Sequence, residues 1–261
     1  MISITRFTAL AAIAVSPLAL HPNSAAAEDY VQVGTGIDYS SGDYGNADDT
    51  KILSVPFSLK VKKDAFFVRA SLPYLHLKGP GSVVGGDGGP VPGGSPGAVT
   101  SNDGIGDLSL SAGYTLDVTD STYIDLIGRV KVPTASEAKN LGTGTTDFTA
   151  EAAITHQFGE LSLSARGGRR FNGSSARFPL RDVWLAGAGA YYQAGDIMLG
   201  LDYDWREASL STASDRSEVT GSVTYTLTPA VRIQGYGYTG FTDGSPNAGG
   251  GLQLLYRFAM R

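Results

Sequence analysis

The chain has 261 residues, a formal net charge of −5 at pH 7 and no cysteine. The lack of cysteine excludes disulfides, thiol catalysis and cysteine-rich metal sites. The acidic balance, together with the absence of any basic run, argues against nucleic acid as a partner.

The N-terminus has the pattern of a cleavable secretory signal. Arg6 precedes a mostly apolar run at residues 7–20, and Ala25-Ala26-Ala27 precede Glu28. Ser16 and Pro17 interrupt the run, which falls short of the ~20 apolar residues that span a bilayer. We therefore expect residues 1–27 to be a signal peptide, cleaved after Ala27, and residues 28–261 to form the exported domain.

The mature chain reads as about twelve segments of about ten residues, in which apolar and polar side chains alternate. The segments are residues 29–40, 51–61, 65–76, 104–116, 122–132, 147–157, 161–171, 182–193, 196–206, 217–228, 230–241 and 249–258. Segment 182–193 is apolar on both faces, so its phase is open.

The connections between these segments alternate between short and long. Residues 62–64 form a tight turn and residues 77–102 a long loop, and the alternation continues along the chain. This order places all tight turns at one end of a meander, as in outer-membrane barrels. It predicts an all-β fold: a single up-and-down antiparallel transmembrane β-barrel of about 12 strands, with short periplasmic turns and long extracellular loops. A soluble β-sandwich would usually have shorter strands and less regularly graded turns.

Two glycine-rich stretches are expected to be outer loops. NLGTGTTDF at residues 140–148 lacks the Lys and the following helix that a phosphate-binding loop needs. We expect Pro133 to end a strand, Gly142 and Gly144 to turn the backbone, and Asp147 to begin the return strand. The Gly and Pro content of residues 77–102 precludes packing as a helix or strand. Whether this loop folds into the barrel mouth or stays mobile is left open.

Most strand charges fall on the phase that would line the lumen, because a charge facing lipid at mid-depth costs ~2–4 kcal/mol. Arg169 is an exception near a strand end. The predicted pore-lining residues are Arg69, Asp107, Asp125, Arg129, Lys131, Glu151, Arg166, Arg170, Asp202, Asp204, Arg206, Glu218 and Arg232, with Asp38 and Arg257 on the same phase.

Two interpretations of this lumen stay open. In one, pairs such as Arg129 or Arg166 with Glu151 fill a narrow barrel. In the other, the arginines attract anionic or zwitterionic solutes, with rings of charge setting selectivity. The inner Tyr236 and Tyr238 would add a stacking surface or act as filler.

Catalysis is not expected. His76 and His156 stand in no nucleophile or zinc motif, and Ser162 and Ser164 lie on the inner phase across a tight turn from His156. Nothing in the sequence requires a metal or organic cofactor. Outward tyrosines tend toward strand ends, as in an interfacial girdle: Tyr39, Tyr74, Tyr114, Tyr203, Tyr225 and Tyr256.

Three stretches, GIGDLSLSAGYTL, YIDLIGRVKVPTAS and NLGTGTTDFTAEAAITHQF, resemble the outer-membrane family named for the meta pathway of phenol degradation. The matching positions are Gly104, Gly106, Asp107, Val132, Pro133, Thr134, Gly142, Gly144, Asp147 and Phe148. The resemblance implies an outer-membrane barrel for uptake of small aromatic or apolar compounds, with bilayer lipid, solutes and the barrel-assembly machinery as partners. The chain departs from the usual barrel ending, since three residues follow Phe258.

The sequence thus predicts a non-enzymatic outer-membrane channel for passive passage of small solutes, aromatic or anionic, through a lumen of mixed charge, with residues 77–102 helping to select what enters. The alternative is a non-conducting structural or adhesion barrel that acts through its extracellular loops. A third hypothesis is an outer-membrane lipid hydrolase.

Overall fold

The computed structural model describes residues 29–80, 83–84, 91–92 and 99–260. The predicted signal peptide and its cleavage point lie outside these residues. The strands of the main wall are β1 (Tyr30–Gly42), β2 (Thr50–Lys63), β3 (Phe66–Pro80), β7 (Leu108–Thr119), β8 (Thr122–Val132), β9 (Asp147–Phe158), β10 (Leu161–Phe171), β11 (Val183–Ala194), β12 (Ile197–Arg206), β13 (Arg216–Thr226), β14 (Val231–Gly240) and β15 (Ala248–Ala259).

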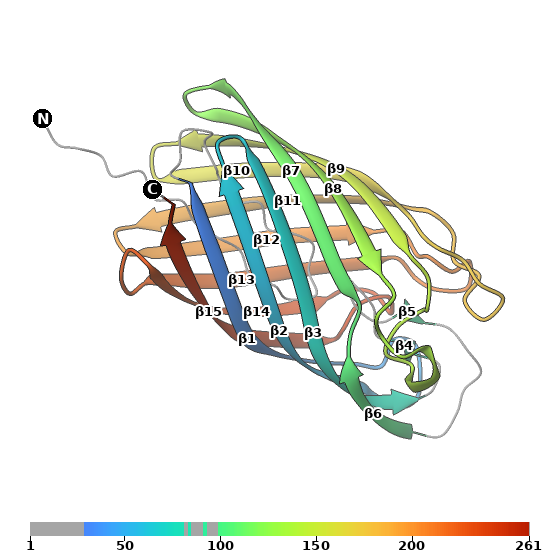
Figure 1. Cartoon of the computed structure of the whole chain (residues 1–261). Coiled ribbons are helices and arrows are strands. Elements are labelled where there is room, and N and C mark those ends of the chain that lie inside the picture. Colours follow the sequence, from blue (N-terminus) through green and yellow to red (C-terminus); the bar gives the residue numbers. More distant parts are fainter. Residues whose placement is uncertain (1–28, 81–82, 85–90, 93–98, 261) are drawn as a thin grey trace, which may run out of the picture.

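These strands form one antiparallel barrel. Each pairs with its neighbours in the chain, and β1 also pairs with β15 from Tyr30 opposite Ala259 to Ser41 opposite Ala248, which closes the sheet. Figure 1 shows the strands tilted around a common axis, with tight turns at one end and longer connections at the other. We call these the short-turn end and the loop end. The predicted up-and-down barrel is confirmed.

The sheet contains one further strand, β6 (Val99–Ile105), which continues the line of β7. Strand β3 pairs with β7 through Phe66–Ser71 and with β6 through Tyr74–Pro80. Gly106 and Asp107 separate β6 from β7, so the predicted segment 104–116 is in fact interrupted near its start.

The expectation of no strand within residues 77–102 was also wrong in part. Strand β3 runs to Pro80, two short strands β4 (Val83–Val84) and β5 (Val91–Pro92) pair with each other, and β6 begins at Val99. Pairing between β3 and β6 satisfies backbone groups there despite the Gly and Pro content. The rest of this loop, and so its position relative to the barrel mouth, lies outside the described residues.

Alternate residues of each strand face inward or outward, as the period of two requires. Strand β11, whose phase the sequence left open, buries Val183, Leu185 and Tyr191 inside and exposes Trp184 and Tyr192 outside. Its neighbours β10 and β12 decide this phase, because paired residues share a face. Among the described residues, no helix is both long and apolar enough to cross a membrane.

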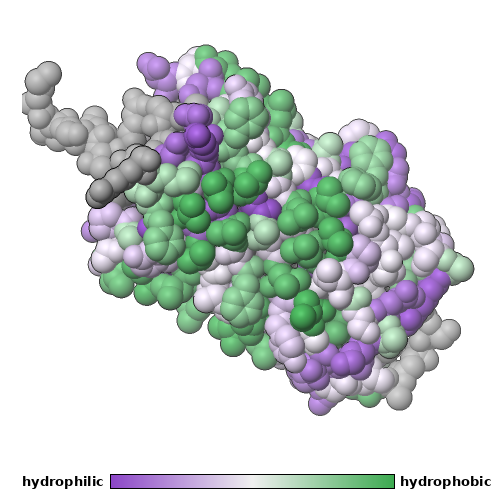
Figure 2. Space-filling model, in the orientation of Figure 1, coloured by the Kyte–Doolittle hydropathy of each residue, from purple (hydrophilic) through white to green (hydrophobic). Residues whose placement is uncertain are grey.

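The outward face is an apolar belt. Figure 2 shows apolar side chains across the middle of the wall and hydrophilic ones toward its two ends. All six tyrosines expected on the outside are exposed, between 36% for Tyr114 and 47% for Tyr39. An apolar outer belt over a closed barrel is the arrangement a bilayer requires, because no backbone polar group is left facing lipid.

Candidate functional site

The barrel interior holds all of the predicted charged residues. Asp107, Asp125, Lys131, Glu151, Arg170, Asp202, Asp204, Glu218 and Arg232 are buried, and Arg69, Arg129, Arg166 and Arg206 are partly exposed. Arg169, the predicted exception, lies at the outer loop end, where it is 3.6 Å from Asp182 and its guanidinium is 5.1 Å from the Trp184 ring.

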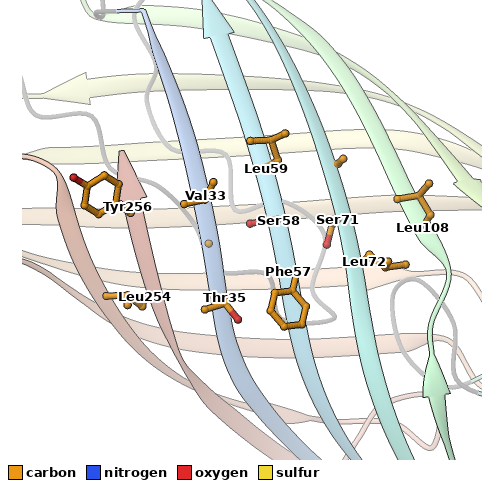
Figure 3. Close-up of a pocket in the computed structure, with 12 residues that line it drawn as sticks. Val33, Thr35, Phe57, Ser58, Leu59, Ser71, Leu72, Leu108, Leu254 and Tyr256 are labelled. Carbon is orange, nitrogen blue, oxygen red and sulfur yellow. The ribbon is translucent and has the colours of Figure 1, made fainter. Parts of the chain in front are cut away.

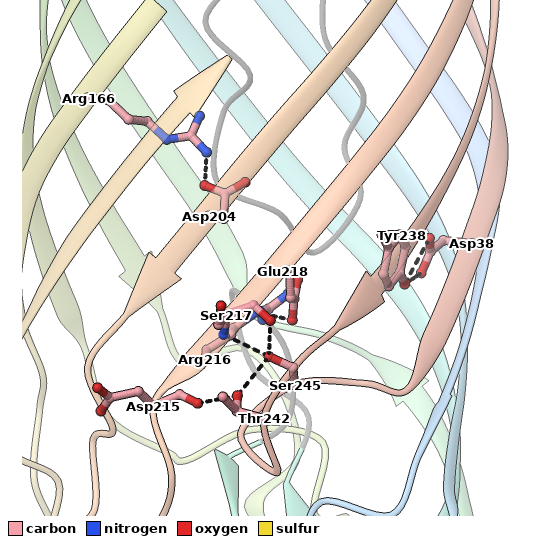
Figure 4. A network of polar contacts seen from close by, with 10 residues as sticks. All are labelled: Asp38, Arg166, Asp204, Asp215, Arg216, Ser217, Glu218, Tyr238, Thr242 and Ser245. Carbon is pink, nitrogen blue, oxygen red and sulfur yellow. Dashed lines mark hydrogen bonds and ion pairs between the residues drawn. The ribbon is translucent and has the colours of Figure 1, made fainter. Parts of the chain in front are cut away.

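Several interior acids accept hydrogen bonds from neighbouring strands. Arg166 of β10 pairs with Asp204 of β12 across the intervening Gly187, whose missing side chain leaves room for the guanidinium (Figure 4). Tyr191 donates its hydroxyl to Asp202. Arg166 therefore pairs with Asp204, a partner that alternation within single strands did not indicate.

A second cluster lies toward the loop end. Tyr236 and Tyr238 of β14 stack with ring centroids 6.3 Å apart and both donate hydroxyl hydrogen bonds to Asp38 of β1, at 2.9 and 3.1 Å. Nearby, Arg216 donates to Glu218 at 2.6 Å. Figure 4 shows Tyr238 with Asp38 and Arg216 with Glu218.

The loop between β8 and β9, residues 133–146, folds into the barrel mouth. Its Ala135 and Leu141 pack against Ile52, Leu75 and Leu77, which are inward residues of β2 and β3. We call residues 133–146 the inward loop. A short 3-10 helix at Glu137–Lys139 lies within it. The sequence predicted an outer loop here, and the structure adds that its apolar residues are buried inside the rim.

One lysine fastens both ends of the inward loop. Lys131 Nζ lies 2.8 Å from Asp147 Oδ2 and 3.5 Å from Asp107 Oδ2, and it donates to Thr143 Oγ1 at 2.8 Å. Asp107 Oδ1 in turn accepts the Ala135 N–H at 3.0 Å. We call Lys131, Asp107, Asp147 and Thr143 the clasp. All four are buried.

Close packing explains the glycines of the loop motif. A Cβ at Gly142 would lie 2.7 Å from the Ala135 Cβ and 2.9 Å from Asp107 Oδ2. Gly144 has a φ of +70°, a conformation that side chains disfavour, and a Cβ there would meet Glu137. Glycine at positions 142 and 144 therefore allows the inward loop to pack closely against Asp107 of the clasp and against its own residues Ala135 and Glu137.

A neighbouring loop holds the inward loop from the solvent side. Arg177, between β10 and β11, donates to Asn140 Oδ1 at 2.7 Å and to the Glu137 carbonyl at 3.1 Å. Lys139 donates to the Asp103 carbonyl of β6 at 3.1 Å. These exposed hydrogen bonds hold the solvent side of the inward loop, in addition to the buried contacts of the clasp.

Sequence reasoning missed several interior residues. Lys60 and Lys62 of β2 face inward and are buried, as is Arg216, which had been assigned to a loop. Extending the alternation by two residues from Glu218 would have found Arg216. For Lys60 and Lys62, the alternation of β2 could have found them. Ile52, Ser54 and Ser58 face inward, and every second residue after Ser58 is one of the two lysines.

The residues considered for hydrolysis do not assemble. His156 is on the outward phase of β9, where its ring lies against Phe158 and its Nδ1 is 2.7 Å from Thr122 Oγ1. Ser162 and Ser164 are on the inward phase of β10, on the other side of the wall. In the described part of the chain, no group of three or more His, Asp or Glu is placed to hold a metal ion.

An apolar hollow of about 490 Å³ lies on the outer wall across β15, β1, β2, β3 and β7. Figure 3 shows large outward side chains such as Phe57, Leu59 and Tyr256 around it, with the smaller Ser58 and Ser71 also lining it. The hollow is part of the apolar outer belt. The polar and charged side chains of the strands gather instead in the barrel interior.

The family described as "Putative MetA-pathway of phenol degradation" matches residues 50–258. The chain belongs to this family. The match takes in the whole clasp and the inward loop, and it confirms the resemblance seen in the sequence. No curated protein sequence matches the chain.

Solved structures share the fold at low sequence identity. The COG4313 outer membrane channel from Pseudomonas putida F1 has a TM-score of 0.68 at 15% identity, over 89% of this chain and 96% of that one. The NanC porin has a TM-score of 0.55 at 9% identity, over 88% and 100%. The CymD monoaromatic hydrocarbon channel has a TM-score of 0.50 at 12% identity, over 91% and 90%.

Proposed function

We propose that this family member is an outer-membrane channel through which small solutes pass passively. The observation that carries the proposal is the division of the wall into an apolar outer face and an interior lined by charged and hydroxyl side chains along the length of the strands. Each charge inside a barrel costs desolvation free energy that its partners must offset, so the number of interior charges supports a polar pore.

Small aromatic and anionic compounds are the solute classes we propose. Interior arginines such as Arg69 and Arg129 are partly exposed and would attract anions, and charged rings set selectivity in channels. The family description and the monoaromatic hydrocarbon channel of similar fold support the aromatic class. The signal peptide, and with it assembly by the barrel-assembly machinery after export, are part of the same proposal.

The inward loop would set the width of the entrance. It is seated on the inner wall by Leu141 and Ala135 and fastened by the clasp, so it occupies part of the mouth. We propose that it shares control of entry with residues 77–102. The same observation favours the second candidate, a barrel that does not conduct and acts through its loops, because an inward loop also narrows the lumen.

Single-channel recording of the refolded mature chain, residues 28–261, in planar bilayers separates the two. Discrete conductance steps are the expected result. Heat-modifiable migration on a gel would show that the barrel has folded, so a folded, lipid-inserted barrel that never conducts would contradict the channel and favour the second candidate.

A further inference from the structure

Five cations stand in one cross-strand row of the interior. Residues paired in an antiparallel ladder point to the same face, so the row can be followed from strand to strand. The five are Arg257 of β15, Lys60 of β2, Arg69 of β3, Arg129 of β8 and Arg170 of β10. Gln32, Ser111 and Thr149 occupy the positions between them. The row contains no acidic residue.

The row runs along the lumen as well as around it. Arg257 is two residues from the end of β15 at the short-turn end, while Arg170 is next to the last residue of β10 at the loop end. Strand tilt in a barrel produces this rise, because a row perpendicular to the strands climbs the axis. A solute that follows the row would meet positive charge at successive depths.

Within the row, the positive charges of Lys60 and Arg69 are the least balanced by nearby acidic groups. They are direct partners on β2 and β3, and like charges placed opposite each other destabilise a strand pair. The described residues provide neither of them with an ion pair. Lys60 Nζ instead lies 4.6 Å from the centroid of the Phe67 ring and 5.9 Å from that of Tyr30.

Interior acids near this pair are already engaged. Asp125 is the acid whose charge acts on Lys60, and it accepts a hydrogen bond from Thr115. Glu151 interacts with Arg166, Arg129 and Arg170, toward the loop end of the row. Asp38, Asp202, Asp204 and Glu218 accept hydrogen bonds from tyrosines or arginines of β10 to β14. Asp107 and Asp147 pair with Lys131.

We propose that Lys60 and Arg69 form a binding step for the carboxylate of small organic anions, on an anion path that follows the basic row. The anion would relieve the repulsion between the two cations. The path rests on the proposed channel function, whereas the binding step does not require conduction.

The first test is the reversal potential of the refolded chain in a tenfold KCl gradient. The wild-type channel prefers chloride, and Lys60→Gln/Arg69→Gln lowers the chloride-to-potassium permeability ratio by roughly fivefold for each charge, the factor that corresponds to ~1 kcal/mol for a unit charge at 4 Å in water. Lys60→Arg/Arg69→Lys keeps the ratio. Lys63→Gln removes a positive charge from an exposed outward position three residues along β2 from Lys60, and leaves the ratio unchanged. A conducting Gln/Gln channel with wild-type selectivity would overturn the anion path.

The second test does not depend on conduction. Benzoate raises the unfolding temperature of the wild-type barrel in detergent, because a ligand that binds only the folded state stabilises it. The shift is lost in Lys60→Gln/Arg69→Gln and kept in Lys60→Arg/Arg69→Lys. An equal shift in all three proteins would overturn the binding step, and absence of current with a preserved benzoate shift would contradict the channel while supporting the step.

Discussion

Lys131 of β8 lies 2.8 Å from Asp147 at the start of β9, with side chains only 3% and 7% exposed, so a buried ion pair joins the two ends of the inward loop. Asp107, before β7, lies 3.5 Å from the same ammonium. Three separate parts of the family motif therefore meet at one nitrogen atom.

Removing one partner of this pair should destabilise the barrel. Asp147→Asn leaves Lys131 with a weaker partner in a buried site, and breaking a buried pair costs about 3–5 kcal/mol. We expect a loss near the lower end of that range, because Asp107 remains, and a larger conductance as the inward loop loosens. Urea unfolding in detergent and single-channel recording measure the two effects.

Asp182→Asn is the matched control for the clasp. Its pair with Arg169 is longer, at 3.6 Å, and both side chains are more than a third exposed. Such a surface pair contributes about 0–1 kcal/mol. Equal losses of unfolding free energy in the two variants would contradict a structural role for the clasp.

A single methyl group should disturb the seat of the inward loop. Gly142→Ala places a Cβ 2.7 Å from Ala135, and overpacking of this kind costs about 1–3 kcal/mol. Gly128→Ala on the neighbouring strand meets nothing within 4 Å and serves as the control. The free energies of unfolding are compared, together with protease cleavage within the inward loop, which should increase only for Gly142→Ala.

The Asp38 cluster should depend on its tyrosine hydroxyls. Tyr236→Phe and Tyr238→Phe each remove a donor from a buried carboxylate, and hydrogen bonds to charged groups contribute about 1.5–3 kcal/mol. Tyr225→Phe, on the outward face, should change the free energy of unfolding little. A double-mutant cycle measures the coupling, and strictly additive losses would argue against a shared acceptor.

Charge on the outer wall should have a depth-dependent effect. Leu201 of β12 and Val118 of β7 are both 56% exposed, but Leu201 lies mid-strand and Val118 next to the short turn. Arg at the bilayer midplane costs about 2–4 kcal/mol and near the interface about 0–1 kcal/mol. Leu201→Arg should therefore destabilise the folded barrel in liposomes far more than Val118→Arg, measured as the loss in free energy of unfolding. Similar losses would contradict the placement of the belt.

The link between two outer loops should weaken in acid. Asp43 Oδ1 accepts the Gly45 N–H at 2.8 Å and Oδ2 accepts Asn247 Nδ2 at 3.1 Å, and these bonds hold the pKa of Asp43 below its ordinary 3.8. A lowered pKa means that the stabilisation is present above the unfolded value and is lost as the pH falls through the folded value. Amide exchange at Gly45 should accelerate below pH 3.8 relative to the intrinsic rate. Asp43→Asn should show no such transition.

The twelve strands of the closed barrel, the phase of every one except β11, and the alternation of turns and loops could be predicted from the sequence, because each such strand repeats with a period of two whatever its neighbours do. Strand β12 illustrates this, with Asp202, Asp204 and Arg206 inward as expected. Strand β11 could not be phased in the same way, because both of its faces are apolar and only pairing with β10 and β12 selects one. The short strands β4 and β5 and the extra strand β6 could not be predicted.

Most of the residues that face into the barrel could be determined from the sequence alone, through alternation and the cost of placing charge in lipid. The exceptions are Lys60, Lys62, Arg216 and the inward residues of β11. The partners of those residues were decided by the tertiary structure. Arg166 reaches Asp204, Lys131 joins Asp107 to Asp147, and Lys60 aligns with Arg69 because of register between strands and the tilt that closes the barrel. Register depends on hydrogen bonds between separate segments, and no pattern within one segment contains it.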